Sequence, residues 1–180
     1  MTKAASLQKR ETNPYAIHED FLAIFNESLD ELYQLSFLLT RDHGTAERCL
    51  VGGLEDCVTS NRIFRDWAHS WAKRVIVQNA IRELKPRPNV STFLSSGAIV
   101  PDIDSPDGHV AMSAVLGLGD FERFVFVMSV LEHYSEHECA LLLGCSSKEI
   151  REARARALKE LTDLSRRDLL LDELFQQETK

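Results

Sequence analysis

Residues 134–158 read YSEHECALLLGCSSKEIREARARAL. Two helix starts lie close together in this stretch, because Ser135 with Glu138 and Ser146 with Glu149 both have the form of a capping box. Between them, an apolar turn of leucines ends at Gly144, a residue type that commonly stops a helix. The stretch therefore predicts two helices joined by a tight turn, which is a helix-turn-helix.

Three residues set the geometry of this predicted pair. Ala140 lies where the first helix has to pass close to the second, so that only a small side chain fits there. Gly144 supplies the turn, because a positive φ is cheap only for a residue without a Cβ. Ile150 is then expected to fill the core between the two helices.

The second helix of such a pair lies in the major groove of DNA, where its N-terminal residues meet base edges. Its expected inner face consists of Ile150, Ala153, Ala157 and Leu161. The predicted DNA contacts, on or near the outer face, are Ser147, Lys148, Arg151, Glu152, Arg154, Arg156 and Lys159.

These contacts differ in chemistry. Lys148 and Arg151 can reach a base or a phosphate, and Glu152 can accept a hydrogen bond from a cytosine amine. The three basic residues further along are expected to meet phosphates. The alternative interpretation is a solvated face, in which glutamate and basic residues stabilise the helix through pairs four residues apart.

The charge of the chain is unevenly distributed. The 180 residues carry a formal net charge of -7, which argues against a surface that is basic throughout. Residues 62–87 nevertheless hold seven basic and two acidic residues, and residues 147–161 hold five basic and three acidic ones. This distribution permits two separate contacts with a polyanion.

Proline marks a boundary in the middle of the chain. Four of the five prolines lie between residues 86 and 106, and proline disfavours regular helix. We therefore predict an all-α protein with two helical domains, at 15–85 and 111–175, joined by a flexible linker at 86–110. The C-terminal domain contains the helix-turn-helix.

The first domain shows helical periodicity. An apolar face recurs at three- and four-residue steps through Phe21, Ile24, Phe25, Leu29, Leu32, Leu35 and Leu39. A break is expected at residues 42–44, with Thr45 as the cap of a second helix that Gly52 and Gly53 weaken. A third helix is predicted over 63–84, and a buried helix over 121–131 in the second domain.

Several classes of function find no support in the sequence. No phosphate-binding glycine loop or nucleophile elbow is present, so we expect no catalytic residues, no cofactor and no enzyme activity. His133, His137, Cys139 and Cys145 have no standard metal-ligand spacing, so we expect no metal site. Short apolar runs and a polar N-terminus predict a cytoplasmic protein with free thiols and no membrane contact.

The C-terminal half resembles the extracytoplasmic-function (ECF) type of RNA polymerase sigma factor. The resemblance covers about 118–161, and its motifs are Tyr134-Ser135-Glu136, Cys139-Ala140, Leu143-Gly144-Cys145-Ser146, Ile150-Arg151 and Arg156-Ala157. It implies that this domain reads the upstream (−35) promoter element as duplex DNA. It also implies that core RNA polymerase, promoter DNA and an anti-sigma factor are partners.

The N-terminal domain resembles the same family over about 21–84, through Leu32-Tyr33, Leu39-Thr40, Asp42 and Ala46-Glu47. Trp71, followed by Lys73 and Arg74, resembles the helix that melts and holds the downstream (−10) element. Aromatic faces can stack on unpaired bases while basic side chains follow the backbone. The predicted single-strand contacts are Arg65, Trp67, Trp71, Lys73 and Arg74; alternatively, both tryptophans belong to the core.

Some positions depart from the family pattern. Residues 48–53 read RCLVGG where acidic and amide residues usually grip the polymerase, Gln78 and Asn79 stand where the family has one asparagine, and Ala153 replaces a frequent arginine. Two alternatives to a sigma factor therefore stay open. One is a helix-turn-helix regulator without productive polymerase engagement, and the other is a decoy that binds an anti-sigma factor.

Overall fold

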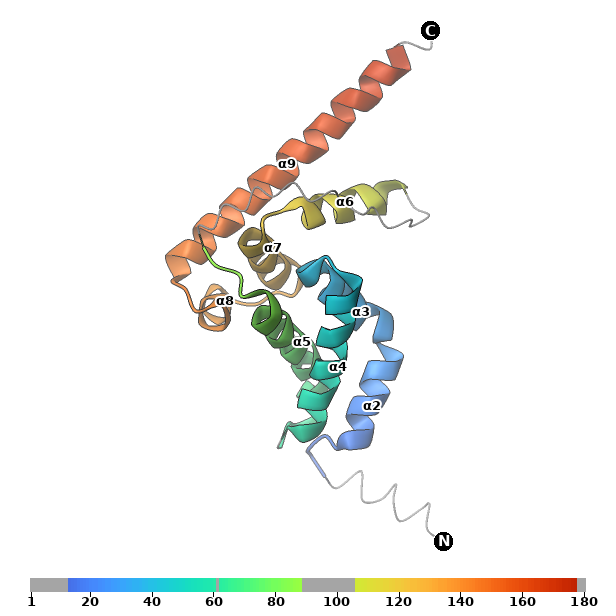
Figure 1. Cartoon of the computed structure of the whole chain (residues 1–180), viewed down its shortest axis with the longest axis vertical. Coiled ribbons are helices and arrows are strands. Elements are labelled where there is room, and N and C mark those ends of the chain that lie inside the picture. The colour runs from blue at the N-terminus through green and yellow to red at the C-terminus, as the bar shows by residue number, and fades with distance from the viewer. Residues whose placement is uncertain (1–12, 61, 89–105, 178–180) are drawn as a thin grey trace. The chain divides into compact units, whose positions relative to one another are not determined.

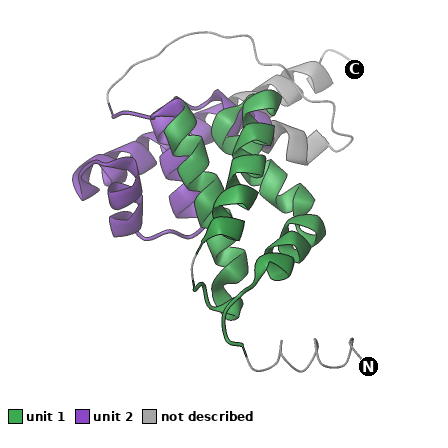
Figure 2. Cartoon of the chain, turned by 60° about the horizontal axis from the view of Figure 1, so that its bottom comes forward, with its two compact units in different colours: residues 1–83 green, residues 84–180 purple. Residues whose placement is uncertain are grey.

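The computed structural model describes residues 13–60, 62–88 and 106–177 (Figure 1). Within these ranges every regular element is helical, apart from an isolated antiparallel bridge between Tyr15 and Phe64. The all-α prediction is therefore confirmed. The chain separates into two compact units, residues 1–83 and residues 84–180, each of which is considered by itself (Figure 2).

The first unit opens with two helices, α2 (His18–Glu27) and α3 (Leu29–Thr40), which are separated at Ser28. The predicted apolar face is buried at Phe21, Phe25, Leu32, Leu35 and Leu39. Leu29 was expected on this face but is 48% exposed. The reason is that the break at Ser28 starts a new helix, whose phase differs from that of α2.

Helix α4 (His43–Thr59) begins where the sequence predicts a break, but its cap is Asp42 and not Thr45. The Asp42 carboxylate accepts a hydrogen bond from the Thr45 amide at 2.7 Å. Aspartate is a strong capping residue because its oxygen satisfies an amide that has no partner within the helix. The helix then continues unbroken through Gly52 and Gly53, so the predicted weak point does not interrupt it.

Helix α5 (Ala68–Leu84) starts later than the predicted residue 63 and follows a single 3-10 turn, η1 (Arg65–Trp67). The backbone around residue 64 is instead paired with the N-terminal segment. The Ala16 amide donates to the Ile63 carbonyl at 2.7 Å, and the Arg65 amide donates to the Pro14 carbonyl at 2.8 Å. This pairing holds Phe64 in an extended conformation that a helix cannot include.

The second unit opens with α6 (Pro106–Gly117), which begins inside the predicted linker 86–110. Proline is favoured in the first turn of a helix because its missing N–H has no partner there. Most of that linker, residues 89–105, lies outside the described residues. Helix α7 (Asp120–Phe126) then continues into a π-helical turn, η2 (Val127–Leu131), so the predicted buried segment 121–131 is helical.

The core of the second unit includes a buried arginine. Arg123 has no exposed surface, and its guanidinium donates to the Leu118 carbonyl at 3.0 Å and pairs with Asp120 at 2.9 Å. Helices α8 (Glu136–Leu143) and α9 (Ser147–Gln177) complete the unit, and both α7 and α8 pack against α9. In the described part of the chain, no helix combines the length and the apolar character that a bilayer crossing requires.

Candidate nucleic-acid interface

The turn between α8 and α9 has the backbone conformation that the sequence predicts. Gly144 ends α8 with φ of 64°, in the left-handed region that favours glycine. The Cys145 amide donates to the Ala140 carbonyl at 3.0 Å, which satisfies one of the last carbonyls of α8. Residues 136–155 are thus two helices, with α9 leaving the turn beside α8 (Figure 1).

Both predicted capping boxes are present. The Glu138 amide donates to Ser135 Oγ at 3.2 Å, and the Ser135 amide donates to the Glu138 carboxylate at 2.9 Å. In the same way, the Glu149 amide donates to Ser146 Oγ at 3.3 Å, and the Ser146 amide donates to Glu149 at 2.8 Å. These bonds satisfy amides that a helix start leaves without partners, so they fix where α8 and α9 begin.

The inner face of the pair is also as predicted. Ile150, Ala153 and Ala157 have no exposed surface, and Ala140 of α8 is 7% exposed. The alanine at position 153, where the resemblance suggests an arginine, belongs to this buried face. Leu161, the last predicted member, is only half-buried.

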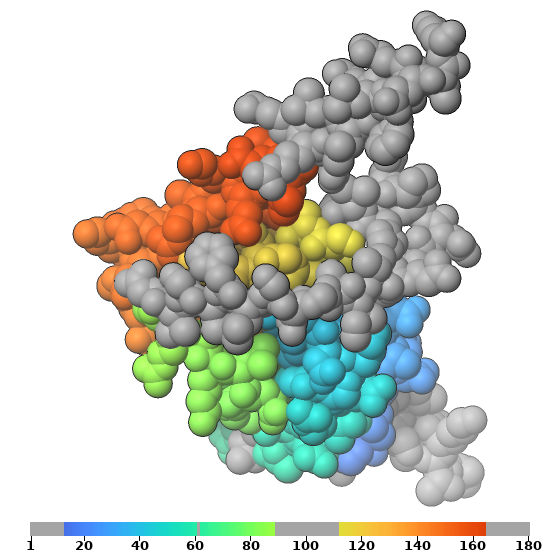
Figure 3. All heavy atoms as spheres, turned by 45° about the horizontal axis from the view of Figure 1, so that its top comes forward, coloured from blue at the N-terminus to red at the C-terminus, as the bar shows by residue number. Residues whose placement is uncertain are grey.

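The outer face at the start of α9 carries three exposed charged residues. The side chains of Lys148, Arg151 and Glu152 are 77%, 57% and 53% exposed. Lys148 Nζ lies 3.8 Å from Glu152 Oε1 on the same helix, and Arg151 Nη1 lies 2.5 Å from Glu136 Oε1 on α8. Atoms of this part of the chain, orange in Figure 3, lie at the surface of the face shown. Ser147, in the same turn, is half-buried.

The three other basic residues of the predicted set on α9, Arg154, Arg156 and Lys159, differ in their exposure and in their partners. Arg156 donates to Glu122 of α7 through Nε at 3.0 Å and Nη2 at 2.8 Å, so its guanidinium joins two helices of the unit. Arg154 is half-buried, whereas Lys159 is exposed. Lys159 is therefore the most open of the three to a phosphate, and Arg156 also ties α9 to α7.

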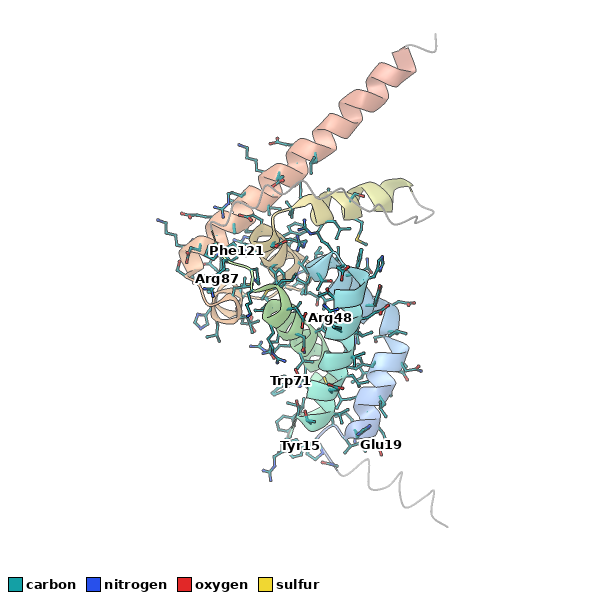
Figure 4. All side chains as sticks on the ribbon, in the orientation of Figure 1. Tyr15, Glu19, Arg48, Trp71, Arg87 and Phe121 are labelled. Carbon is teal, nitrogen blue, oxygen red and sulfur yellow. The ribbon has the colours of Figure 1, made fainter. Side chains whose placement is uncertain are left out.

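The two tryptophans of the first unit have different environments. Trp67 is 65% exposed, and its ring meets the Phe64 ring edge-on at 5.3 Å between centroids. Phe64 in turn packs against Tyr15 at 4.9 Å, which makes an exposed aromatic group. Trp71 is half-buried on α5, and its Nε1 donates to Ser60 Oγ at 3.2 Å (Figure 4). The alternative in which both tryptophans form the core is therefore wrong for Trp67.

Two of the three basic side chains predicted beside the tryptophans pair with carboxylates of the same unit. Arg65 Nε lies 3.3 Å from Asp20, and Lys73 Nζ lies 2.6 Å from Glu31. The hydrogen bond from Lys73 holds the pKa of Glu31 below its usual value. Arg74 is half-buried on α5. Arg65 and Lys73 are thus held by carboxylates of their own unit before any DNA backbone is present.

Sequence reasoning did not identify several of these partners. Glu136 is the partner of Arg151, but the two residues lie 15 positions apart and share no local pattern. Tyr15 reaches Phe64 only because the N-terminal segment pairs with the loop before α5. Asn79, noted as displaced from the family position, donates to Asp56 at 3.0 Å and so belongs to the contact between α4 and α5.

The cysteines are poor candidates for chemistry at this surface. Burial raises the pKa of Cys57 to about 12 and that of Cys139 to about 11. Burial also raises the pKa values of Cys49 and Cys145. Among the residues that the structure describes, no group of three or more histidine, cysteine or acidic side chains is arranged to hold a metal ion.

The chain matches no protein-family model and no curated protein. Function is therefore inferred from the geometry and charge of the surfaces themselves. The strongest of these surfaces is the exposed start of α9, which follows a glycine turn after α8 and begins at a capping box.

Proposed function

We propose that this chain is a transcription initiation factor of the ECF sigma type. In this proposal it recruits core RNA polymerase in the cytoplasm, reads duplex promoter DNA with α9, and holds single-stranded DNA with the first unit. The observation that carries the proposal is the pair of helices α8 and α9, joined by a short turn at Gly144, with Lys148, Arg151 and Glu152 exposed at the start of the second helix. We interpret this pair as a helix-turn-helix.

The shape of this surface suits a DNA groove. The major groove is about 12 Å wide and admits one α-helix, whose first residues then approach the base edges. Lys148 and Arg151 supply donors for guanine or phosphate, and Glu152 supplies an acceptor for cytosine. All three side chains are more than half exposed, so they can reach a ligand without unfolding the pair.

The first unit supports the single-strand part of the proposal through its aromatic group. Trp67, Phe64 and Tyr15 form a set of packed rings, and Trp67 keeps 65% of its surface exposed. An unpaired base gains stacking energy on such a ring, whatever its sequence. Two domains of separate function, joined by the segment between α5 and α6, complete the proposed arrangement.

One observation favours a second candidate, a helix-turn-helix regulator that does not engage polymerase productively. The segment 48–53 is expected to face the polymerase, yet Arg48 pairs with Glu83 at 3.3 Å and Gly53 lies against Ile76. These residues serve the packing of α4 on α5. Polymerase binding would then depend on neighbouring exposed residues of α4, such as Val51, which is 57% exposed.

A single experiment separates these candidates from an anti-sigma decoy. Purified full-length chain is mixed with core RNA polymerase of the same organism, the complex is isolated, and run-off transcription from genomic fragments is measured. Binding of the chain alone to the same duplex fragments is measured at low salt. A sigma factor forms the complex and yields defined transcripts. A regulator binds duplex DNA without supporting transcription from core enzyme, and a decoy does neither, even at low salt where phosphate contacts are strongest.

A further inference from the structure

Glu136 and Arg151 form an ion pair across the helix-turn-helix. Glu136 is the first residue of α8, and Arg151 lies in the second turn of α9. Arg151 Nη1 is 2.5 Å from Glu136 Oε1, and the two side chains are 57% and 28% exposed. The carboxylate is thus the more covered partner, and it holds the more exposed guanidinium from one side.

The chemistry of the guanidinium leaves room for a second ligand. Its five N–H donors lie in one rigid plane, so a carboxylate that binds through one nitrogen leaves other donors available. Because Arg151 is more than half exposed, those donors are accessible to solvent. A side chain whose rotamer is already restrained also loses less entropy when it binds.

We propose that Glu136 is a positioning residue, which holds the guanidinium of Arg151 in the orientation that reads a base edge. The inference rests on the proposed DNA-reading function of α9. Arginine binds any phosphate of the DNA backbone, and such contacts carry no sequence information. The Glu136 carboxylate opposes these phosphate contacts, because it restrains the Arg151 side chain and repels nearby phosphates. Glu136 therefore favours sequence specificity over non-specific affinity.

The neighbouring pair on α9 does not have the same geometry. Lys148 and Glu152 lie 3.8 Å apart on the same helix, and both side chains are more than half exposed. Exposed pairs of this kind contribute little, because both long side chains lose freedom and water screens the charges. The pair between Glu136 and Arg151 joins two helices at a shorter distance, so positioning is assigned to Glu136 alone.

The test compares specific with non-specific binding. The full-length wild-type chain first selects a preferred duplex from a random pool. The affinities of wild type and of E136Q for that duplex and for a scrambled duplex are then measured. We expect the ratio of the two affinities to fall about tenfold, the smaller end of the discrimination that one bidentate arginine provides. Affinity for the scrambled duplex should stay the same or rise, because a negative charge has been removed.

The control E160Q makes the same charge change at an exposed position further along α9 and should leave the ratio unchanged. In an R151A background, E136Q should have no additional effect on the ratio. An unchanged ratio in E136Q, or a parallel loss of both affinities as expected from a merely structural role, overturns the inference. If the wild-type chain selects no duplex, the proposed function itself fails, and the inference falls with it.

Discussion

Gly53 of α4 lies so close to Ile76 of α5 that a Cβ at position 53 would stand 2.9 Å from the Ile76 Cγ1 atom. A Cβ at the adjacent Gly52 would stand 2.9 Å from the Asn79 Oδ1 atom. Asn79 also donates a hydrogen bond to Asp56 of α4 at 3.0 Å. The glycine pair therefore allows two helices to approach closely. This approach, and not a weak point in the helix, is what the two glycines provide in the first unit.

The variant G53A should destabilise the first unit. A Cβ at this position overlaps a buried isoleucine that has no exposed surface, and overpacking of a core typically costs about 1–3 kcal/mol. Urea unfolding monitored by circular dichroism measures the change. G117A is the matched control, because nothing lies within 4 Å of the added Cβ there. Equal stabilities of G53A and wild type would show that the approach of α4 and α5 is not tight.

The cap at the start of α9 should make the thermal stability of the protein depend on pH in the acid range. Hydrogen bonds from the Ser146 amide and hydroxyl lower the pKa of Glu149. A lowered carboxylate pKa means that the stabilisation is fully present above the ordinary glutamate pKa, about 4.3, and is lost as the pH falls through the folded value. The Tm difference between wild type and E149Q should therefore be largest near pH 7 and shrink in acid.

Thermal unfolding between pH 7 and pH 3.5 measures this difference. E160Q, at an exposed glutamate later in α9, removes one charge without touching the cap and should show a smaller Tm change at pH 7. A Tm difference between wild type and E149Q that stays constant from pH 7 to pH 3.5 would contradict the assigned role of Glu149 in the cap.

The cysteines should resist alkylation in the folded protein. Thiolate is the reactive form, and burial raises the pKa of Cys57 to about 12 and that of Cys139 to about 11. Cys49 is buried as well, whereas Cys145 is only partly buried. Peptide mapping after brief iodoacetamide treatment should find Cys145 modified first and the other three modified only in urea. Rapid modification of Cys57 without denaturant would contradict the burial of its thiol.

Charge reversal on the outer face of α9 should separate base from phosphate contacts. R151E should lower affinity for a selected duplex by about tenfold or more, because it removes a base-reading donor and adds a repelled charge. K159E should weaken binding to all sequences more uniformly and reduce the salt dependence, as loss of one phosphate contact predicts. Fluorescence anisotropy at several salt concentrations measures both. R41E, an equal charge change at an exposed residue outside both basic segments, is the control.

Much of the second unit could be predicted because its signals are local. Ser135 with Glu138, Ser146 with Glu149, and the glycine at 144 each act within one helical turn, and each has the expected geometry. The burial of Ile150 and Ala157 also follows from spacing along one helix. Local patterns of this kind need no knowledge of distant segments.

The errors came from contacts between distant segments. The start of α5 moved from residue 63 to Ala68 because the backbone there pairs with residues 14–16. Lys73 is bound to Glu31, a partner 42 positions away, which no local pattern indicates. Arg156, predicted as a phosphate contact, also joins α9 to Glu122, a partner that no local pattern indicates, and its phosphate contact stays a prediction. Charge patterns alone do not distinguish a ligand-binding cation from one that serves the fold.

Start-site mapping is the decisive test of the proposed sigma function. Core RNA polymerase, a library of genomic fragments and either wild-type chain or R151E are combined, and the 5′ ends of the transcripts are sequenced. A sigma factor yields discrete start sites that require the chain, share an upstream duplex element and are lost with R151E, although R151E still binds polymerase. Transcripts no more defined than those of core enzyme alone, or start sites unchanged by R151E, would contradict the proposed function.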